Sequence, residues 1–220
     1  MIFELDNVEL YFKNKRILNG IYLKAETGKV TAILGRNGCG KSSLLDIAFG
    51  TLKSKYKLIR LDSQPLLKPL YKTGLAKYLP QYNFIPRGMK LKQAFKFFNL
   101  EWSLFVDTIE SLSIYENSKF QDLSGGERRL IETYIILKTK SKIVILDEPF
   151  SHLAPLHVET IKQLIKEEKE TKAIIISDHM YQHIIDAADT IYLLNNGTTK
   201  KIKALTELED YKYLNEGSLS

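Results

Sequence analysis

The sequence predicts an α/β protein with a mostly parallel sheet, an antiparallel β region near its N-terminus and a small helical insertion. Two observations predict the parallel sheet. First, short apolar runs without alternation recur along the chain, as expected of strands covered on both faces. These runs are residues 30–34, 143–146, 173–176 and 190–194. Second, strands that alternate with helices favour a parallel sheet. Helical stretches are expected at residues 43–49, 128–138, 156–170 and 180–187.

Other segments lie before, within and after this predicted core. Residues 3–12 and 21–25 alternate loosely, which favours antiparallel strands. Residues 91–113 carry apolar side chains at helical spacing with no strand candidate among them, which predicts the helical insertion. Residues 195–198 read Asn-Asn-Gly-Thr, typical of a hairpin turn, and residues 204–213 favour a terminal helix.

Size and composition limit the class of protein. A chain of 220 residues holds one domain or one core with an inserted subdomain. The composition, 44% hydrophobic and 26% charged, is that of an ordinary globular protein, and no run approaches the ~18 apolar residues of a membrane span. The start of the sequence lacks a secretory signal, and the single cysteine, Cys39, has no disulfide partner. Both features predict a cytoplasmic location.

The net charge of +6 is unevenly distributed. Residues 52–96 contain eleven basic side chains against Asp62 alone, so this segment carries +10 and the remainder −4. Such a segment is suited to an anionic lipid surface or to nucleic acid. Solvated lysines are an equally good interpretation. Nucleic acid is the weaker partner hypothesis, because no aromatic-interleaved RNA motif or recognition helix stands out.

Residues 35–43, Gly-Arg-Asn-Gly-Cys-Gly-Lys-Ser-Ser, fit the phosphate-binding pattern G-x-x-x-x-G-K-[ST] between a predicted strand and a predicted helix. Glycines let the backbone close around phosphates, Lys41 is suited to the β- and γ-phosphates, and the Ser42 hydroxyl is suited to Mg²⁺. The pattern predicts ATP or GTP binding. The candidate nucleotide-binding residues here are Gly35, Arg36, Asn37, Gly38, Cys39, Gly40, Lys41, Ser42 and Ser43.

Two further motifs carry polar groups. Asp147 and Glu148 follow a buried strand, at the end of a parallel sheet where ligands bind. Asp147 is suited to hold Mg²⁺ and Glu148 to reach an attacking water, although adjacent acids also cap helices. Residues 123–127, Leu-Ser-Gly-Gly-Glu, open a helical stretch. Ser124, Gly125 and Gly126 therefore offer either a second anion-binding geometry or a plain helix cap.

Together these three elements resemble the ATP-binding cassette family, the nucleotide-binding domains of ABC transporters, in order and spacing across nearly the whole chain. The resemblance implies a P-loop NTPase core of the RecA-like type, with residues 123–127 as the family signature. It implies that Tyr11 stacks on adenine, with Phe12 as the competing candidate. It also implies a metal set of Ser42, Gln81 and Asp147. The catalytic set that it implies is Lys41, Gln81, Glu148 and His179.

The resemblance also implies an organisation and partners. The whole chain, 1–220, is expected to be one ABC ATPase domain, with 1–82 and 128–220 forming the core and 83–127 the helical subdomain. ATP and Mg²⁺ are the expected ligands. Two copies, or one copy and another ABC ATPase, are expected to pair so that Ser124 to Gly126 of one subunit closes over the nucleotide of the other. Transmembrane permease subunits are the expected partners, with the chain peripheral at the inner face of the cell membrane.

One departure from the family pattern keeps other functions open. Ala154 stands where the family usually has an aspartate that crosses the dimer interface, which favours a regulatory cassette with impaired hydrolysis as one alternative. A soluble ABC-type ATPase of DNA repair, translation or cluster assembly is another alternative. Forty-one residues separate Gln81 from Leu123, a compact helical subdomain. Neither the transported substrate nor the direction of transport is indicated.

Overall fold

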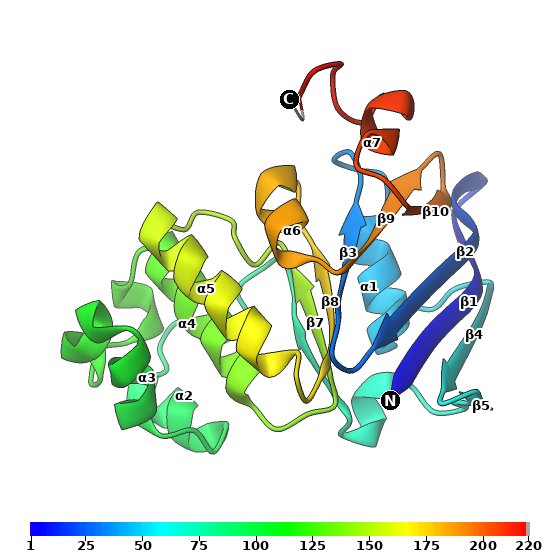
Figure 1. Ribbon diagram of the computed structural model, residues 1–220. Helices are drawn as coiled ribbons and strands as arrows, with labels where there is room; N and C mark the ends of the chain where they lie inside the picture. Colours follow the sequence, from blue (N-terminus) through cyan, green and yellow to red (C-terminus); the bar gives the residue numbers. More distant parts are fainter. Residues whose placement is uncertain (219–220) are drawn as a thin grey trace.

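The computed structural model describes residues 1–218 and contains a six-stranded sheet at its centre (Figure 1). The strand order is β10-β9-β3-β8-β7-β6, and all neighbours pair in parallel except the β9–β10 hairpin. Three central strands are fully buried, as expected of a sheet covered on both faces. The strands are β3 (Val30–Leu34), β6 (Ala76–Leu79), β7 (Ile143–Asp147), β8 (Ala173–Ser177), β9 (Thr190–Asn195) and β10 (Thr198–Ile202).

A second, antiparallel sheet lies beside the first. Its strand order is β2-β1-β4-β5. The strands are β1 (Ile2–Phe12), β2 (Lys15–Glu26), β4 (Tyr56–Leu61) and β5 (Gln64–Pro65). Helix α1 (Lys41–Phe49) lies between the two sheets, because one hydrophobic core combines its apolar side chains with those of β1, β2, β3 and β7 (Figure 1). This packing fixes the start of α1, and with it the end of the phosphate-binding pattern.

Helices cover the other face of the central sheet. Helix α4 (Gly125–Lys138) is buried along most of its length and packs against α5 (Pro155–Glu168). Helix α6 (Tyr181–Ala187) follows β8, and a short 3₁₀ turn, η1 (Leu70–Thr73), precedes β6. The middle of the chain forms α2 (Leu91–Phe97), α3 (Trp102–Thr108) and the 3₁₀ turns η2 (Glu110–Tyr115) and η3 (Phe120–Asp122). The rings of Phe95 and Phe105 pack against Tyr134 of α4, which anchors this insertion to the core.

The structure confirms the predicted fold class and corrects several elements. The helical insertion is two short helices, because Asn99 adopts a left-handed φ of 55° between them. The predicted terminal helix over residues 204–213 shrinks to α7 (Glu207–Asp210). Strands β4 and β6 lie within the basic segment, where no strand was expected. The division into a core and a helical subdomain at 83–127 stays a prediction.

The basic segment 52–96 does not form one continuous surface. It runs from β4 through η1 and β6 to α2, and β4 and α2 lie at opposite ends of the molecule (Figure 1). Among residues 1–218, no helix is both long enough and apolar enough to cross a membrane.

Candidate functional site

The phosphate-binding pattern forms a tight loop between β3 and α1. Gly38 and Gly40 adopt φ values of +77° and +108°, which side chains other than glycine rarely tolerate. A Cβ on Gly35 would lie 2.6 Å from Cys39 Sγ and 2.7 Å from the Leu194 carbonyl oxygen, so this position also requires glycine. Lys41 begins α1 and is buried, and its Nζ donates to the carbonyls of Gly35 at 2.7 Å and Arg36 at 3.3 Å. The loop therefore surrounds a lysine ammonium.

This loop opens onto a cavity of about 500 Å³ at the carboxyl ends of the parallel strands. The cavity brings together residues that are far apart in the sequence. Its lining residues are Phe12, Ile17, Asn37, Gly38, Gly40, Lys41, Ser42, Ser43, Gln81, Glu148 and His179. Most residues of the predicted phosphate loop and all four expected catalytic residues, Lys41, Gln81, Glu148 and His179, thus line one space. The second acidic candidate, Asp147, does not line the cavity, but its carboxylate lies close to the hydroxyl of Ser42, which does.

Asp147 is fully buried at the end of β7 and keeps one oxygen free. Its Oδ1 accepts a hydrogen bond from Ser177 Oγ at 2.5 Å, whereas Oδ2 has no hydrogen-bond partner within residues 1–218. Burial raises the pKa of Asp147, and the nearby hydroxyls of Ser177 and Ser42 oppose that rise. The Ser42 hydroxyl lies close to the carboxylate without hydrogen-bond geometry to Oδ2. A free buried carboxylate oxygen beside a hydroxyl fits Mg²⁺, which is bound through few protein oxygens together with phosphates and waters.

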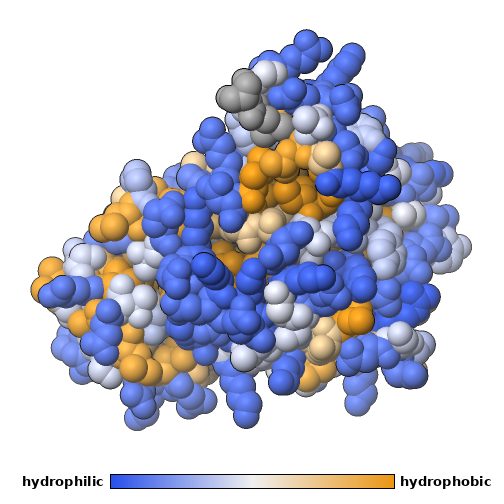
Figure 2. Space-filling view, in the orientation of Figure 1, coloured by the Kyte–Doolittle hydropathy of each residue, from blue (hydrophilic) through white to orange (hydrophobic). Residues whose placement is uncertain are grey.

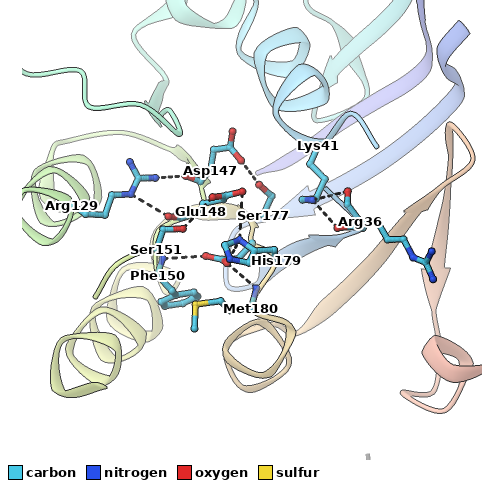
Figure 3. Close-up of polar contacts among 12 residues, drawn as sticks. Arg36, Lys41, Arg129, Asp147, Glu148, Phe150, Ser151, Ser177, His179 and Met180 are labelled. Atoms are coloured by element: carbon cyan, nitrogen blue, oxygen red, sulfur yellow. Dashed lines mark hydrogen bonds and ion pairs between the residues drawn. The ribbon is translucent and has the colours of Figure 1, made fainter. Parts of the chain in front are cut away.

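Glu148 occupies a strained turn directly after β7. Its φ is +54°, and its N–H donates to the Ser177 carbonyl at 2.7 Å. The carboxylate faces the cavity, with Oε2 accepting from Ser151 Oγ at 3.1 Å and Oε1 lying 3.6 Å from His179 Nδ1 (Figure 3). Non-glycine residues in this conformation cluster at functional sites. The histidine side chain is about half exposed, at 46%, and so stands at the mouth of the cavity.

Two buried residues that sequence reasoning did not single out support this turn. Asp178 Oδ1 accepts from the Met180 N–H at 2.9 Å and Oδ2 from the Phe150 N–H at 3.2 Å, which ties the segment after β8 to the segment after β7. Burial raises the pKa of Asp178, and its two backbone hydrogen bonds oppose that rise. The second residue is Arg129 of α4, whose guanidinium donates to the carbonyls of Asp147 and Glu148. The sequence does not show that a charged residue such as Arg129 is buried, because its neighbours are known only from the fold.

The structure separates the two aromatic candidates at the end of β1. Phe12 lines the cavity and is half exposed, whereas Tyr11 does not line it. The Tyr11 ring lies instead under the Arg16 guanidinium at 5.4 Å and the Lys55 ammonium at 5.0 Å. Successive side chains of a strand point to opposite faces, so only one of the two can face the loop. Of the two, only Phe12 is placed at the cavity, and stacking of either ring on a base stays a prediction.

The predicted signature lies outside the cavity. Ser124 caps α4 through a reciprocal capping box, in which its Oγ accepts from the Glu127 N–H at 3.2 Å and its own N–H donates to Glu127 Oε2 at 2.8 Å. A Cβ on Gly126 would lie 2.4 Å from the His152 carbonyl oxygen, so this helix start packs tightly against the segment after β7. None of Ser124, Gly125 and Gly126 lines the cavity that holds Lys41.

Solved structures share this fold. An ATP-binding subunit of an ABC transporter superposes with a TM-score of 0.83 at 19% identity, covering 100% of this chain and 96% of that chain. A nucleotide-free ATP-binding cassette from an ABC transporter gives a TM-score of 0.79 at 22% identity, covering 97% and 96%.

Sequence comparison gives the family. An uncharacterized ABC transporter ATP-binding protein of Methanocaldococcus jannaschii is 28% identical, over 98% of this chain and 84% of its own length. The energy-coupling factor transporter ATP-binding protein EcfA of Methanococcus maripaludis is 33% identical, over 87% of this chain and 74% of its own length. The family model described as ABC transporter matches residues 18–151, from β2 through the phosphate loop and α4 to the turn after Glu148. The chain therefore belongs to the ABC transporter family, as one of its ATP-binding proteins.

Proposed function

We propose that the chain binds ATP with Mg²⁺ and hydrolyses it, and that this hydrolysis powers a transporter built with transmembrane partner subunits. One observation carries the proposal. The cavity joins the phosphate loop and Lys41 to the Glu148 carboxylate, and Ser42 in its lining lies close to the buried carboxylate of Asp147, which keeps one oxygen free. Phosphoryl transfer needs these three elements: a cradle for the phosphates, a metal anchor and a group that orients water.

The phosphate loop binds the triphosphate of ATP. The first residues of α1, Lys41 to Ser43, line the cavity, and the positive end of a helix favours anions. Lys41 Nζ exchanges its bonds to the Gly35 and Arg36 carbonyls for phosphate oxygens, so the ammonium is already held at the centre of the loop. Phe12 and Ile17 supply an apolar wall at the other end of the cavity for the base. Phe12 thus takes the stacking role first expected of Tyr11.

Asp147 and Ser42 hold the metal ion, with Gln81 as the third member of the set. Asp147 contributes Oδ2, and Ser42 contributes its hydroxyl from the first turn of α1. A metal ion held there would neutralise negative charge that develops on the transferred phosphate. Gln81 lines the same cavity from the segment after β6, where its amide would be available to the metal ion or to the attacking water.

Glu148 is the general base. Its carboxylate accepts a proton from the water that attacks the γ-phosphate, and Ser151 holds one carboxylate oxygen in place at 3.1 Å. His179 lies beside the other oxygen, with Nδ1 at 3.6 Å from Oε1 and 3.4 Å from Asp178 Oδ1. Nδ1 thus faces two carboxylates, which leaves Nε2 as the ring nitrogen available to the γ-phosphate.

A second subunit completes the site. The three signature residues, Ser124 to Gly126, lie at the exposed start of α4 and outside the chain's own cavity. We propose that they close over the nucleotide of a second copy, or of another ABC ATPase. Ala154 begins α5 without a side-chain cap and contributes no carboxylate to that contact.

Partner subunits in the membrane are supported by the helical insertion and by the relatives. Phe97, Leu104 and Ile114 of the insertion are 73%, 56% and 78% exposed, and Figure 2 shows apolar surface on that side of the molecule. Relatives of this chain include a phosphate import ATP-binding protein and a lipopolysaccharide export ATP-binding protein. We place the chain at the cytoplasmic face of the membrane, with the cargo chosen by the partners.

Phosphate release from Mg–ATP by the purified chain tests the proposed function, with Glu148→Gln as the matched variant. We expect the wild-type protein to release phosphate steadily. The glutamine variant keeps the shape of the side chain and loses the base, so it binds ATP and releases phosphate at least about 100-fold more slowly. Equal rates for the two proteins would remove Glu148 from the mechanism. A wild-type protein that binds ATP without turnover would instead support the regulatory cassette that Ala154 suggests.

A further inference from the structure

Arg129 is a buried cation whose hydrogen bonds all go to main-chain carbonyls at the edge of the cavity. The side chain extends from α4 and its residue is only 4% exposed. Its Nε donates to the Glu148 carbonyl at 3.1 Å, its Nη1 to the Pro80 carbonyl at 2.7 Å and its Nη2 to the Asp147 carbonyl. Figure 3 shows the guanidinium aimed at the turn that carries Asp147 and Glu148. One planar group thus connects three chain segments.

Two of these carbonyls belong to the peptide bonds that lead into cavity residues. The Pro80 carbonyl is part of the peptide bond to Gln81, and the Asp147 carbonyl is part of the peptide bond to Glu148. A peptide bond is planar, so holding its C=O fixes the direction of the N–H on the opposite edge. The Glu148 N–H donates to the Ser177 carbonyl at 2.7 Å. Arg129 and Ser177 therefore hold opposite edges of one peptide.

Glu148 depends on such support because of its backbone. With φ at +54°, it sits in the left-handed region, and this conformation persists in non-glycine residues only where the surroundings enforce it. The Arg129 guanidinium donates hydrogen bonds to the carbonyls of Asp147 and Glu148, which lie on either side of the Glu148 Cα. These bonds hold the left-handed backbone conformation directly. Arginine suits this task because its donors form a rigid fork, whereas a lysine offers a single nitrogen.

We propose that Arg129 is a positioning residue for ATP hydrolysis, because it fixes the two peptides that aim Gln81 and Glu148 into the cavity. This role rests on the proposed hydrolysis. It also ties both side chains to α4, the helix whose first residues form the signature. A shift of α4 against a second subunit would thus move the water-orienting groups through one guanidinium.

Arg128 provides a matched control on the same helix. It is similarly buried, at 7% exposure, but its guanidinium donates to the Ile85 carbonyl and pairs with Glu132 at 3.3 Å. Neither partner lines the cavity. Arg128→Lys and Arg129→Lys therefore make the same chemical change at the same depth, and only the second reaches the peptides of Gln81 and Glu148.

The test is steady-state phosphate release by the full chain over a range of ATP concentrations, with thermal midpoints measured in parallel. We expect Arg129→Lys to lower kcat about 10- to 100-fold, since misplacing a reacting group by about 1 Å has an effect of that order. Its KM should stay within about threefold of wild type, because the phosphate loop is untouched. Arg128→Lys should keep kcat within about threefold at a similar thermal midpoint.

Three results would overturn the role of Arg129. The first is a kcat for Arg129→Lys close to wild type. The second is an equal loss of kcat in both lysine variants, which would indicate a structural role alone. The third is failure of both Arg129→Lys and Arg129→Gln to fold while Arg128→Lys folds. A wild-type protein that releases no phosphate would overturn the proposed function, and this role with it, so the two failures are distinguishable.

Discussion

The two aromatic residues at the end of β1 give a sharp prediction, because they are adjacent in sequence and face different surroundings. Phe12 lines the cavity and Tyr11 lies under Arg16 and Lys55. We expect Phe12→Ala to weaken ATP binding and Tyr11→Ala to leave it within about twofold of wild type, because only Phe12 offers a ring face to the base.

The expected loss follows from the exposed area of the ring. A buried aromatic side chain covers about 150–250 Å². Phe12 is 51% exposed, so about 100 Å² remains for a base to cover. At about 25 cal/mol per Å² this area corresponds to about 2.5 kcal/mol, an upper bound because a base covers only one face of the ring. About 1 to 2.5 kcal/mol is therefore expected, a weakening of Kd by about 5- to 60-fold.

Isothermal titration calorimetry of the full-length variants with Mg–ATP measures this difference in Kd. GTP serves as a second ligand, because stacking on an aromatic ring does not depend strongly on the base. Both variants should keep the wild-type thermal midpoint within a few degrees, since neither side chain is buried. A larger loss of affinity for Tyr11→Ala than for Phe12→Ala would refute the assignment and restore Tyr11 as the stacking residue.

Three further predictions concern the signature helix, the metal anchor and a buried ion pair. Gly126→Ala places a Cβ 2.4 Å from the His152 carbonyl oxygen and should lower the free energy of unfolding by about 1–3 kcal/mol in a denaturant titration, whereas Gly125→Ala, which meets nothing within 4 Å, should not lower it. Asp147→Asn should weaken Mg²⁺-dependent ATP binding about 10-fold or more while binding without Mg²⁺ persists, and equal losses in both conditions would contradict a metal role for Asp147. Burial alone would raise the pKa of Glu168, but its bonds to Lys172 at 2.7 Å and Lys138 at 2.9 Å hold that pKa below its ordinary value of 4.5. The ion pair thus stabilises the fold above about pH 4.5 and is lost as the pH falls through the lowered pKa. Glu168→Gln should lower the free energy of unfolding by about 1–3 kcal/mol at pH 7, and a deficit that stays constant below pH 4 would contradict this assignment.

The sequence predicted the central sheet well because its strands are buried on both faces. The unbroken apolar runs before the phosphate loop and before Asp147 appear as β3 and β7 within one residue. The turn at Asn196 and Gly197 was also predicted, and both residues have positive φ in the β9–β10 hairpin. Apolar runs and turn residues depend only on neighbouring positions in the chain, so they can be recognised in a single sequence.

Features that depend on tertiary packing were not predictable. The pairing of β1 with β2 shifts register after Leu5, Val8 and Leu10, so the sequence did not show which of Tyr11 and Phe12 lies on the side of the phosphate loop. Strand β4 is mostly half-exposed and basic, so it lacks an apolar pattern. Arg129 reads as an ordinary surface charge after the signature, and only the fold brings Pro80, Asp147 and Glu148 around it.

The chemical state of the bound nucleotide tests the central claim most directly, namely that this cavity cleaves ATP with Glu148 as the base. The full-length chain and Glu148→Gln are incubated with labelled Mg–ATP, separated rapidly from free nucleotide, and the bound label is identified. We predict that the wild-type chain holds mostly ADP and that the variant holds ATP. Bound ATP in the wild-type chain, or ADP formed equally fast by the variant, would contradict the account.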